Sequence, residues 1–203
     1  MLSKTVRLAS DFAIGGDGTL VYVPGTVTVT DRDVVVSRDG LEQPLGIARG
    51  QYSYLSLSRA GDRLAVDEAN TQDGDLWLWS FESGNAMRLA GGDVRSIYPV
   101  WSRDDSRLTF GVDGANGIRC KAASNTGAVE LLTAATGEGA QIATPCFFAD
   151  ENTLVFREQA HPDTADNIGM VSLEPDAEPV WLLVTEFNER NAVLSPDGWW
   201  MAY

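Results

Sequence analysis

The sequence has little of the chemistry that most enzymes use. Its 203 residues include one histidine and two cysteines. The histidine, His161, lies in the polar stretch EQAHPDTADN without a second histidine or a cysteine nearby, so a zinc site lacks ligands. No serine stands in a Gly-x-Ser-x-Gly context, no Gly-x-Gly-x-x-Gly opens a helix, and the kinase sequences His-Arg-Asp and Asp-Phe-Gly are missing. We therefore expect no catalytic residue, no metal ion and no cofactor in this chain.

Long apolar runs are missing as well. No window approaches the roughly 18 apolar residues of a membrane span, and the first residues lack the apolar core of a signal peptide. We expect no membrane insertion. Cys120 and Cys146 each lie inside an apolar strand-like run, which predicts buried free thiols rather than a disulfide framework.

Basic residues are scarce, with 15 Lys and Arg against 29 Asp and Glu, so the formal net charge is −14. A field of this sign repels phosphate backbones and anionic membrane surfaces, so nucleic acid is not an expected partner. The acidic residues are spread along the chain, which favours a solubilising surface. Three pairs of acids lie in predicted loops: Asp73 and Asp75, Asp104 and Asp105, and Asp163 and Asp166. None of the pairs has the regular spacing of a calcium-binding loop, so we expect them to be solvated side chains in turns.

A repeated pattern of strand, polar turn and strand runs along the whole chain. The copies are FAIGGDGTLVYV, YLSLSRAGDRLAV, PVWSRDDSRLTF, PCFFADENTLVF and AVLSPDGWWMAY. The apolar residue that opens the second strand recurs with spacings of 44, 44, 46 and 47 at Leu20, Leu64, Leu108, Leu154 and Met201. A period of this length is typical of propeller blades.

A second pair of strands lies between these copies. Its turn carries glycine at Gly40, Gly84 and Gly127, where a residue with positive φ can close a hairpin, and Glu174-Pro175-Asp176 in the fourth copy. In DLWLWSF, Leu76 and Leu78 point one way and Trp77 and Trp79 the other, so both faces of this strand are apolar. Such strands are sandwiched between other sheets, as in the radially stacked blades of a propeller.

The fold class predicted from these patterns is all-β, a β-propeller of four-stranded antiparallel blades. The four complete blades cover approximately 11–47, 53–90, 98–133 and 143–184, and a partial blade combines 5–9 with 192–203. Because strands are incomplete at both ends, two arrangements are open: a fragment of a six-bladed ring, or a five-bladed ring closed by the two termini. Open blade edges would favour a homo-oligomer.

The best-kept forms of the pattern are LSPDGWWMAY, GDLWLWSFESGNAMRLA and YPVWSRDDSRLTF. They resemble the propeller repeats of the TolB-like family, which also precede the catalytic domain of prolyl-oligopeptidase-like peptidases and follow bacterial serine/threonine kinases. The stretch FAIGGDGTLVYVPG, followed by VVVSRDGLEQPLG, is most similar to the kinase-associated and uncharacterised TolB-like versions. Ser-Pro-Asp-Gly is intact only at 195–198. The resemblance implies a propeller, and such propellers are commonly extracytoplasmic; the turn motif carries no catalytic information.

The function expected from these features is a non-enzymatic interaction or sensing module that binds a protein or peptide. In propellers, the connections between blades gather at one face of the ring, and aromatic and arginine residues suit recognition. The candidate partner-binding residues on these connections are Tyr52, Tyr54, Arg95, Tyr98, Phe187 and Arg190. Packing at blade edges is an equally open role for them. The alternative function is the non-catalytic propeller part of a larger peptidase or kinase.

Overall fold

The structure is a computed structural model. It describes residues 12–14, 20–22, 34–36, 42–44, 52–68, 74–92, 95–112, 117–133, 142–161, 165–174, 177–195 and 199–203. The predicted strand at 5–9 lies outside these residues.

Within the described ranges the chain forms β-strands and no helix. Four sheets have four strands each, and we call them blades 1 to 4. Blade 1 contains β1 (Phe12–Ile14), β2 (Leu20–Tyr22), β3 (Val34–Val36) and β4 (Glu42–Pro44). Blade 2 contains β5 (Tyr52–Leu57), β6 (Arg63–Glu68), β7 (Leu76–Ser80) and β8 (Ala86–Ala90). Blade 3 contains β9 (Ser96–Trp101), β10 (Arg107–Val112), β11 (Ile118–Ala122) and β12 (Glu130–Thr133).

Blade 4 contains β13 (Ile142–Phe148), β14 (Thr153–His161), β15 (Ala165–Ser172) and β16 (Val180–Leu183). A two-stranded sheet of β17 (Val193–Leu194) and β18 (Met201–Ala202) follows. In every sheet the neighbouring strands are consecutive in the chain and antiparallel. The predicted all-β class and the four-stranded blades are confirmed.

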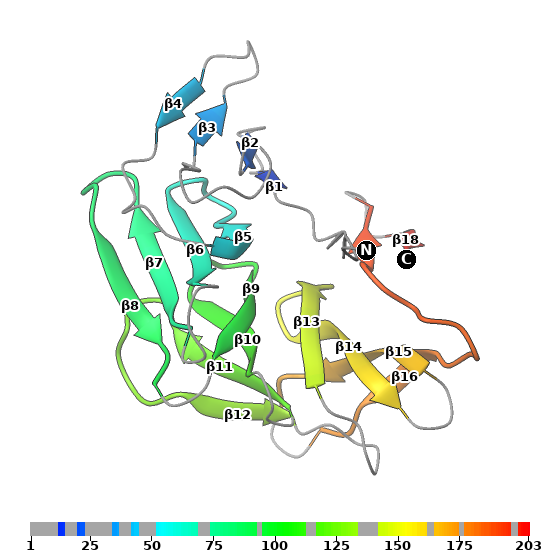
Figure 1. The fold of residues 1–203 in the computed structure, drawn as a ribbon. Helices are drawn as coiled ribbons and strands as arrows, with labels where there is room; N and C mark the ends of the chain where they lie inside the picture. Colours follow the sequence, from blue (N-terminus) through cyan, green and yellow to red (C-terminus); the bar gives the residue numbers. More distant parts are fainter. Residues whose placement is uncertain are drawn as a thin grey trace, which may run out of the picture.

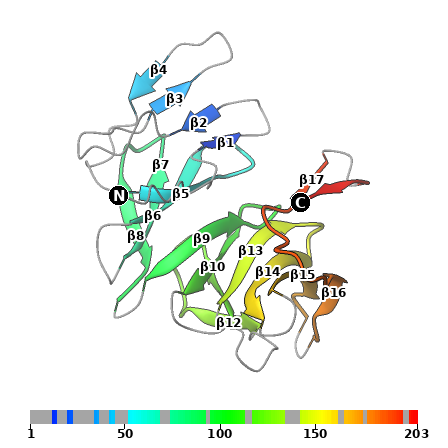
Figure 2. The ribbon, with the colours of Figure 1, turned by 45° about the vertical axis from the view of Figure 1, so that its right-hand side comes forward.

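The blades follow one another along an arc, with their first strands on the inner side (Figures 1 and 2). Strand β5 lies against β1 and β9, β13 lies against β9, and β17 lies against β13. Side chains near the start of these inner strands therefore come together across blade boundaries.

Apolar side chains fill the spaces between blades. Leu76 and Leu78 of β7 join Trp101, Leu108 and Phe110 of blade 3 in one buried cluster. On the other face of the same strand, Trp77 and Trp79 pack in a cluster with β5 and β6. The alternation predicted from the sequence is confirmed, and it explains why this strand is apolar on both faces.

The polar turn between the first two strands is built in the same way in three of the sheets. The hydroxyl oxygen of Ser58 accepts the N–H of Arg63 at 3.0 Å, and Ser102 does the same for Arg107. Ser195 accepts the N–H of Trp200, also at 3.0 Å. In the second type of turn, Gly84 and Gly127 have φ of 65° and 76°, as predicted, and Gly40 lies outside the described residues.

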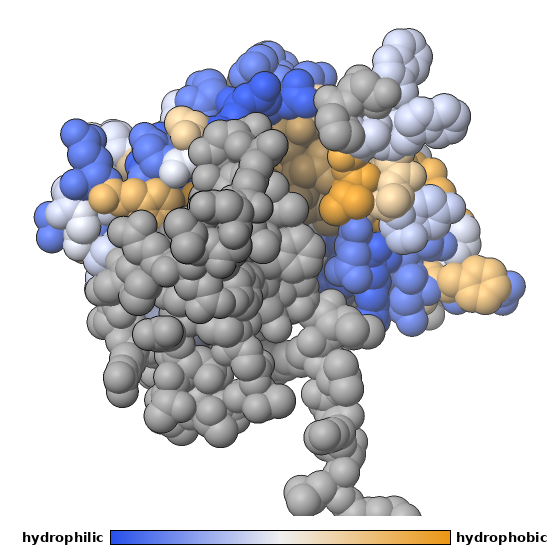
Figure 3. All heavy atoms as spheres, turned by 90° about the horizontal axis from the view of Figure 1, so that it is seen from above, coloured by the Kyte–Doolittle hydropathy of each residue, from blue (hydrophilic) through white to orange (hydrophobic). Residues whose placement is uncertain are grey.

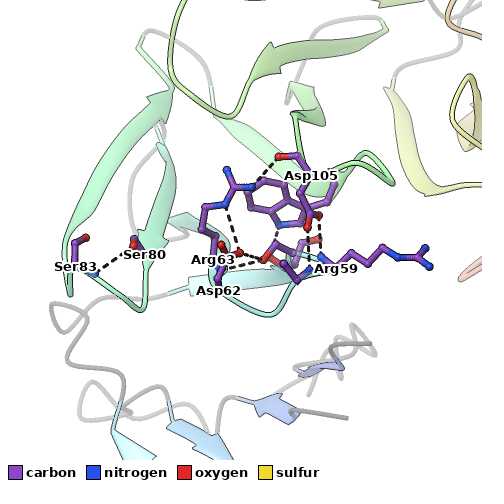
Figure 4. Close-up of polar contacts among 10 residues, drawn as sticks. Arg59, Asp62, Arg63, Ser80, Ser83 and Asp105 are labelled. Atoms are coloured by element: carbon purple, nitrogen blue, oxygen red, sulfur yellow. Dashed lines mark hydrogen bonds and ion pairs between the residues drawn. The ribbon is translucent and has the colours of Figure 1, made fainter. Parts of the chain in front are cut away.

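Two neighbouring turns are also joined to each other. The Asp105 carboxylate accepts the backbone N–H groups of Arg59 and Ala60 at 2.8 and 2.9 Å (Figure 4). The Arg63 side chain donates to the Asp105 carbonyl oxygen at 2.8 Å and lies over the Trp101 ring. Blades 2 and 3 are thereby fastened at the turn end of β5 and β9, opposite to the end where the candidate residues lie.

Candidate functional site

The six candidate residues lie at the start of inner strands or on connections between blades. Tyr52 and Tyr54 are on β5, and Tyr98 is on β9. Arg95 directly precedes β9, and Phe187 and Arg190 lie between β16 and β17. Strand β5 lies beside β9, and β9 lies beside β13. Four of the six candidates therefore belong to one linked group of side chains, which we call the inner-rim cluster. Its members are the candidates Tyr54, Arg95, Tyr98 and Arg190, together with Asp67, Arg157 and Asp166.

Tyr54 and Tyr98 join blades 2 and 3. Their hydroxyl oxygens are 2.8 Å apart and hydrogen-bonded, and their ring centroids are 3.9 Å apart with an interplanar angle of 43°. Tyr98 has a φ of 57°, in the left-handed region that a residue with a bulky side chain rarely adopts. It lies where the register between β9 and β10 shifts, and a bulge of this kind redirects a side chain. The backbone therefore turns the Tyr98 ring toward Tyr54 at the cost of local strain.

Asp67 of β6 holds the backbone of Tyr54 and the side chain of Arg95 in place. Its fully buried carboxylate accepts the Tyr54 backbone N–H at 2.5 Å and pairs with the Arg95 guanidinium at 3.2 Å. Arg95 also donates to the Ser53 hydroxyl at 3.0 Å. Burial raises the pKa of Asp67 to about 6, because desolvation penalises the charged form more than Tyr54 and Arg95 favour it. One carboxylate thus fixes both Tyr54 and Arg95.

The fourth candidate, Arg190, is linked to blade 4 through Asp166 of β15. The Arg190 Nε donates to Asp166 Oδ2 at 2.7 Å, and Nη1 of Arg157 is 3.9 Å from the same oxygen. The Arg157 guanidinium carbon lies 6.0 Å from the centroid of the Tyr98 ring, within the range of a cation–π contact. Blades 2, 3 and 4 therefore all contribute to the cluster.

The remaining two candidates lie apart from these contacts. Tyr52 packs against Leu64, Val66 and Trp79 in the hydrophobic cluster of blade 2, which is the packing role left open by the sequence. Phe187 is 67% exposed, and its backbone N–H donates to the Thr185 hydroxyl at 3.1 Å.

The sequence reasoning missed three members of the cluster: Asp67, Arg157 and Asp166. Each is buried on a strand. The prediction that Asp166 is a solvated turn acid is wrong, because Asp166 lies within β15, is 4% exposed and pairs with Arg190 and Arg157. A charged residue inside a buried strand was the available signal, because such a group is retained only where it is paired.

The cluster offers aromatic rings, hydroxyl groups and guanidinium groups, which suit hydrogen bonding to a polar ligand. No group of three or more His, Cys, Asp or Glu side chains that could hold a metal ion occurs in the part of the chain that the structure describes. In the same part of the chain, no helix has the length and hydropathy needed to cross a membrane.

No protein-family model matches the sequence, and no curated protein matches it. Solved structures do match. TolB from Acinetobacter baumannii is similar with a TM-score of 0.68 and 14% identity, over 89% of this chain and 44% of TolB. An oligogalacturonate lyase from Vibrio parahaemolyticus has a TM-score of 0.69 and 13% identity, over 94% of this chain and 56% of the lyase.

A prolyl endopeptidase is also similar, with a TM-score of 0.60 and 12% identity, over 82% of this chain and 28% of the peptidase. The chain thus spans about half of the length of the TolB and lyase structures and 28% of the length of the peptidase. At identities this low, the likeness informs on architecture and not on activity. The chain therefore has a TolB-like β-propeller fold.

Proposed function

We propose that this propeller is a non-enzymatic module that binds a protein or peptide through the inner-rim cluster. The observation that carries the proposal is the contact between Tyr54 and Tyr98, which joins two blades while both side chains remain partly exposed. Tyrosine and arginine dominate the energetics of protein recognition because they combine apolar area with hydrogen-bonding groups. Arg95 and Arg190 belong to the same cluster, and each pairs with a buried carboxylate, Asp67 and Asp166 respectively.

Charge favours the inner-rim cluster over the rest of the surface as the place of contact. The whole chain has a net charge of −14, whereas the cluster brings three arginines together with two aspartates. The arginines of the cluster favour a ligand with acidic or hydrogen-bond-accepting groups at this face of an otherwise acidic protein.

A test uses a pool of short random peptides, incubated with the immobilised protein and recovered for identification by mass spectrometry. Tyr54→Phe and Arg190→Gln remove single polar contacts in the cluster, and each should reduce peptide retention. Arg59→Gln is the matched control, since Arg59 lies at the turn end of β5, away from the cluster. Retention that is equal in all three variants, or absent in the wild type, contradicts the proposal.

A second candidate function is a propeller that forms part of a larger enzyme, as in the alternative drawn from the sequence. The similarity to the prolyl endopeptidase favours it, because this chain covers only 28% of that protein. The association with a serine/threonine kinase stays a prediction. The reading frame around the coding sequence distinguishes these candidates, since a peptidase or kinase domain in the same frame supports the second one.

A further inference from the structure

In blade 4, two residues that pair across neighbouring strands each carry a buried polar atom without a hydrogen-bond partner among the described residues. Thr144 of β13 and Arg157 of β14 are directly opposite in the antiparallel register. Their exposed fractions are 5% and 9%. The Thr144 hydroxyl oxygen and the Arg157 Nε have no hydrogen-bond partner among the residues that the structure describes.

Unpartnered groups of this kind are costly in a folded protein. A buried hydroxyl or guanidinium N–H without a partner loses its hydration and gains nothing in return. Side chains directly opposite on one face of an antiparallel pair are close enough to contact the same small group. Thr144 and Arg157 therefore present two donors to one place.

The charge of Arg157 is only partly compensated. Its ion-pair partner in the described part of the chain is Asp166, at 3.9 Å, beyond hydrogen-bond distance. The same carboxylate oxygen accepts a direct hydrogen bond from Arg190 at 2.7 Å. Two guanidinium groups thus share one carboxylate. Glu158, the next residue along β14, projects to the opposite face of the strand by the alternation of side chains.

The surroundings connect this pair with the inner-rim cluster. The Tyr98 ring lies 6.0 Å from the Arg157 guanidinium carbon, and its hydroxyl is bonded to that of Tyr54. A ligand that contacts the tyrosines is thus within reach of Arg157. Aromatic neighbours also lower the local polarity, which strengthens a charge-assisted hydrogen bond.

We propose that Arg157 and Thr144 form a subsite for a carboxylate group, with the guanidinium and the hydroxyl both donating to its oxygens. A carboxylate fits because a planar guanidinium can donate two parallel hydrogen bonds to it, and because its negative charge would balance the positive charge of Arg157. The inference deepens the proposed function, on which it rests in part: the peptide ligand would present its carboxyl end to Arg157. A free small carboxylic acid has the same chemistry and is the other source.

The direct readout is the Nε–H signal of Arg157 in ¹⁵N-labelled protein, assigned with Arg157→Lys. The probes are sodium acetate, sodium phosphate, and one pool of short random peptides without acidic side chains, prepared once with a free carboxyl end and once amidated. Acetate and the carboxyl-ended pool should shift the signal, and the amidated pool should bind more weakly.

Thr144→Val is the decisive variant because it removes an unpartnered hydroxyl and keeps the shape of the side chain. Its stability should be unchanged or higher, while its affinity for acetate should fall roughly tenfold through loss of one hydrogen bond to a charged group. Thr126→Val removes an exposed hydroxyl that bonds to Ser124, and it should leave acetate binding unchanged.

The outcomes separate this inference from the proposed function. No shift with any carboxylate, an equal response to phosphate, or unchanged binding in Thr144→Val overturns the carboxylate subsite. Equal binding of the two peptide pools, reduced by Tyr54→Phe and accompanied by no shift with acetate, also overturns the subsite and leaves the proposed function standing. A shift with acetate, lost in Thr144→Val, while neither pool binds, supports the subsite for a free carboxylic acid and contradicts peptide binding.

Discussion

The Asp105 carboxylate accepts the backbone N–H of Arg59 at 2.8 Å, so that a turn of blade 3 is tied to the corresponding turn of blade 2. Asp105 stands where the intact turn motif has glycine, and its φ is 56°. Aspartate in the left-handed region carries strain that glycine would avoid. The departure from the motif is explained by this contact, because glycine has no side chain that could reach the neighbouring turn.

We predict that Asp105→Ala destabilises the protein by about 2 kcal/mol, through loss of two hydrogen bonds and retention of the strained φ. Asp105→Gly loses the same bonds but relieves the strain, so its cost should be lower, about 1 kcal/mol. Urea unfolding followed by tryptophan fluorescence measures both.

The matched control for this pair is Glu151→Gly, at the equivalent position of blade 4. Glu151 is exposed and makes no contact of this kind within the described residues, so its replacement should change the free energy of unfolding by less than about 0.5 kcal/mol. Alanine and glycine variants of equal stability at Asp105 would mean that its backbone conformation is not strained.

The second prediction concerns the hydroxyl contact between Tyr54 and Tyr98. In a double-mutant cycle, Tyr54→Phe and Tyr98→Phe should each destabilise by about 1 kcal/mol, and the double variant should cost no more than either single one. The reason is that each substitution removes the same hydrogen bond. Additive losses would show that the two hydroxyls contribute independently, and the contact would then have no role in joining blades 2 and 3.

Much of the fold was predictable because it depends on local sequence. The repeat spacing specified the four-stranded sheets, the alternation of Leu78 and Trp79 specified which face each side chain covers, and Gly84 marked a turn with positive φ. Each of these features follows from residues that are close in the chain.

The inner-rim cluster was only partly predictable because its contacts cross blade boundaries. Tyr54 and Tyr98 were found as aromatic residues at connections, but their contact depends on a bulge and a left-handed φ that no sequence signal marks. Asp67 and Arg157 belong to different blades, and their roles follow from partners distant in the sequence.

The third prediction concerns the two cysteines. Burial raises the pKa of the Cys146 thiol to about 11, partly offset by Arg157, and burial likewise raises the pKa of Cys120. Only the thiolate reacts with alkylating reagents, so native labelling of Cys146 near pH 8 should be about a hundredfold slower than in urea, and native labelling of Cys120 should also be slower than in urea. The single variants Cys120→Ser and Cys146→Ser assign the two rates, and rapid native labelling of Cys146 would exclude a desolvated thiol.

The fourth prediction concerns self-association, which the sequence led us to expect. Apolar side chains reach the surface of the described part of the molecule (Figure 3), and Trp199 and Trp200 beside β18 are 82% and 75% exposed. Exposed apolar area of this kind favours association with a second copy. Light scattering should show a mass that rises with concentration, and Trp200→Ser should reduce it without lowering the melting temperature. Leu131→Ser, on β12 of blade 3, is the control that should leave the mass unchanged.

The last prediction is a pH dependence caused by Asp67. Its pKa is about 6 in the folded protein against 3.8 as the ordinary value, because burial penalises the carboxylate. Between these values the folded state binds more protons than the unfolded state, so this group stabilises the fold as pH falls, and that contribution is lost as pH rises through 6. From pH 7 to pH 5 the wild type should therefore gain about 1 kcal/mol from Asp67.

Asp67→Asn removes the titrating group, and its free energy of unfolding should lack this gain. The quantity to compare is the difference between wild type and variant at each pH, because the titration of groups common to both proteins cancels in that difference. At pH 7 the variant should be at least as stable as the wild type, because asparagine carries no charge to be desolvated. The variant could instead be less stable at pH 7, with a free energy of unfolding that changes with pH in parallel with that of the wild type. This result would mean that the Arg95 ion pair outweighs the cost of burying Asp67.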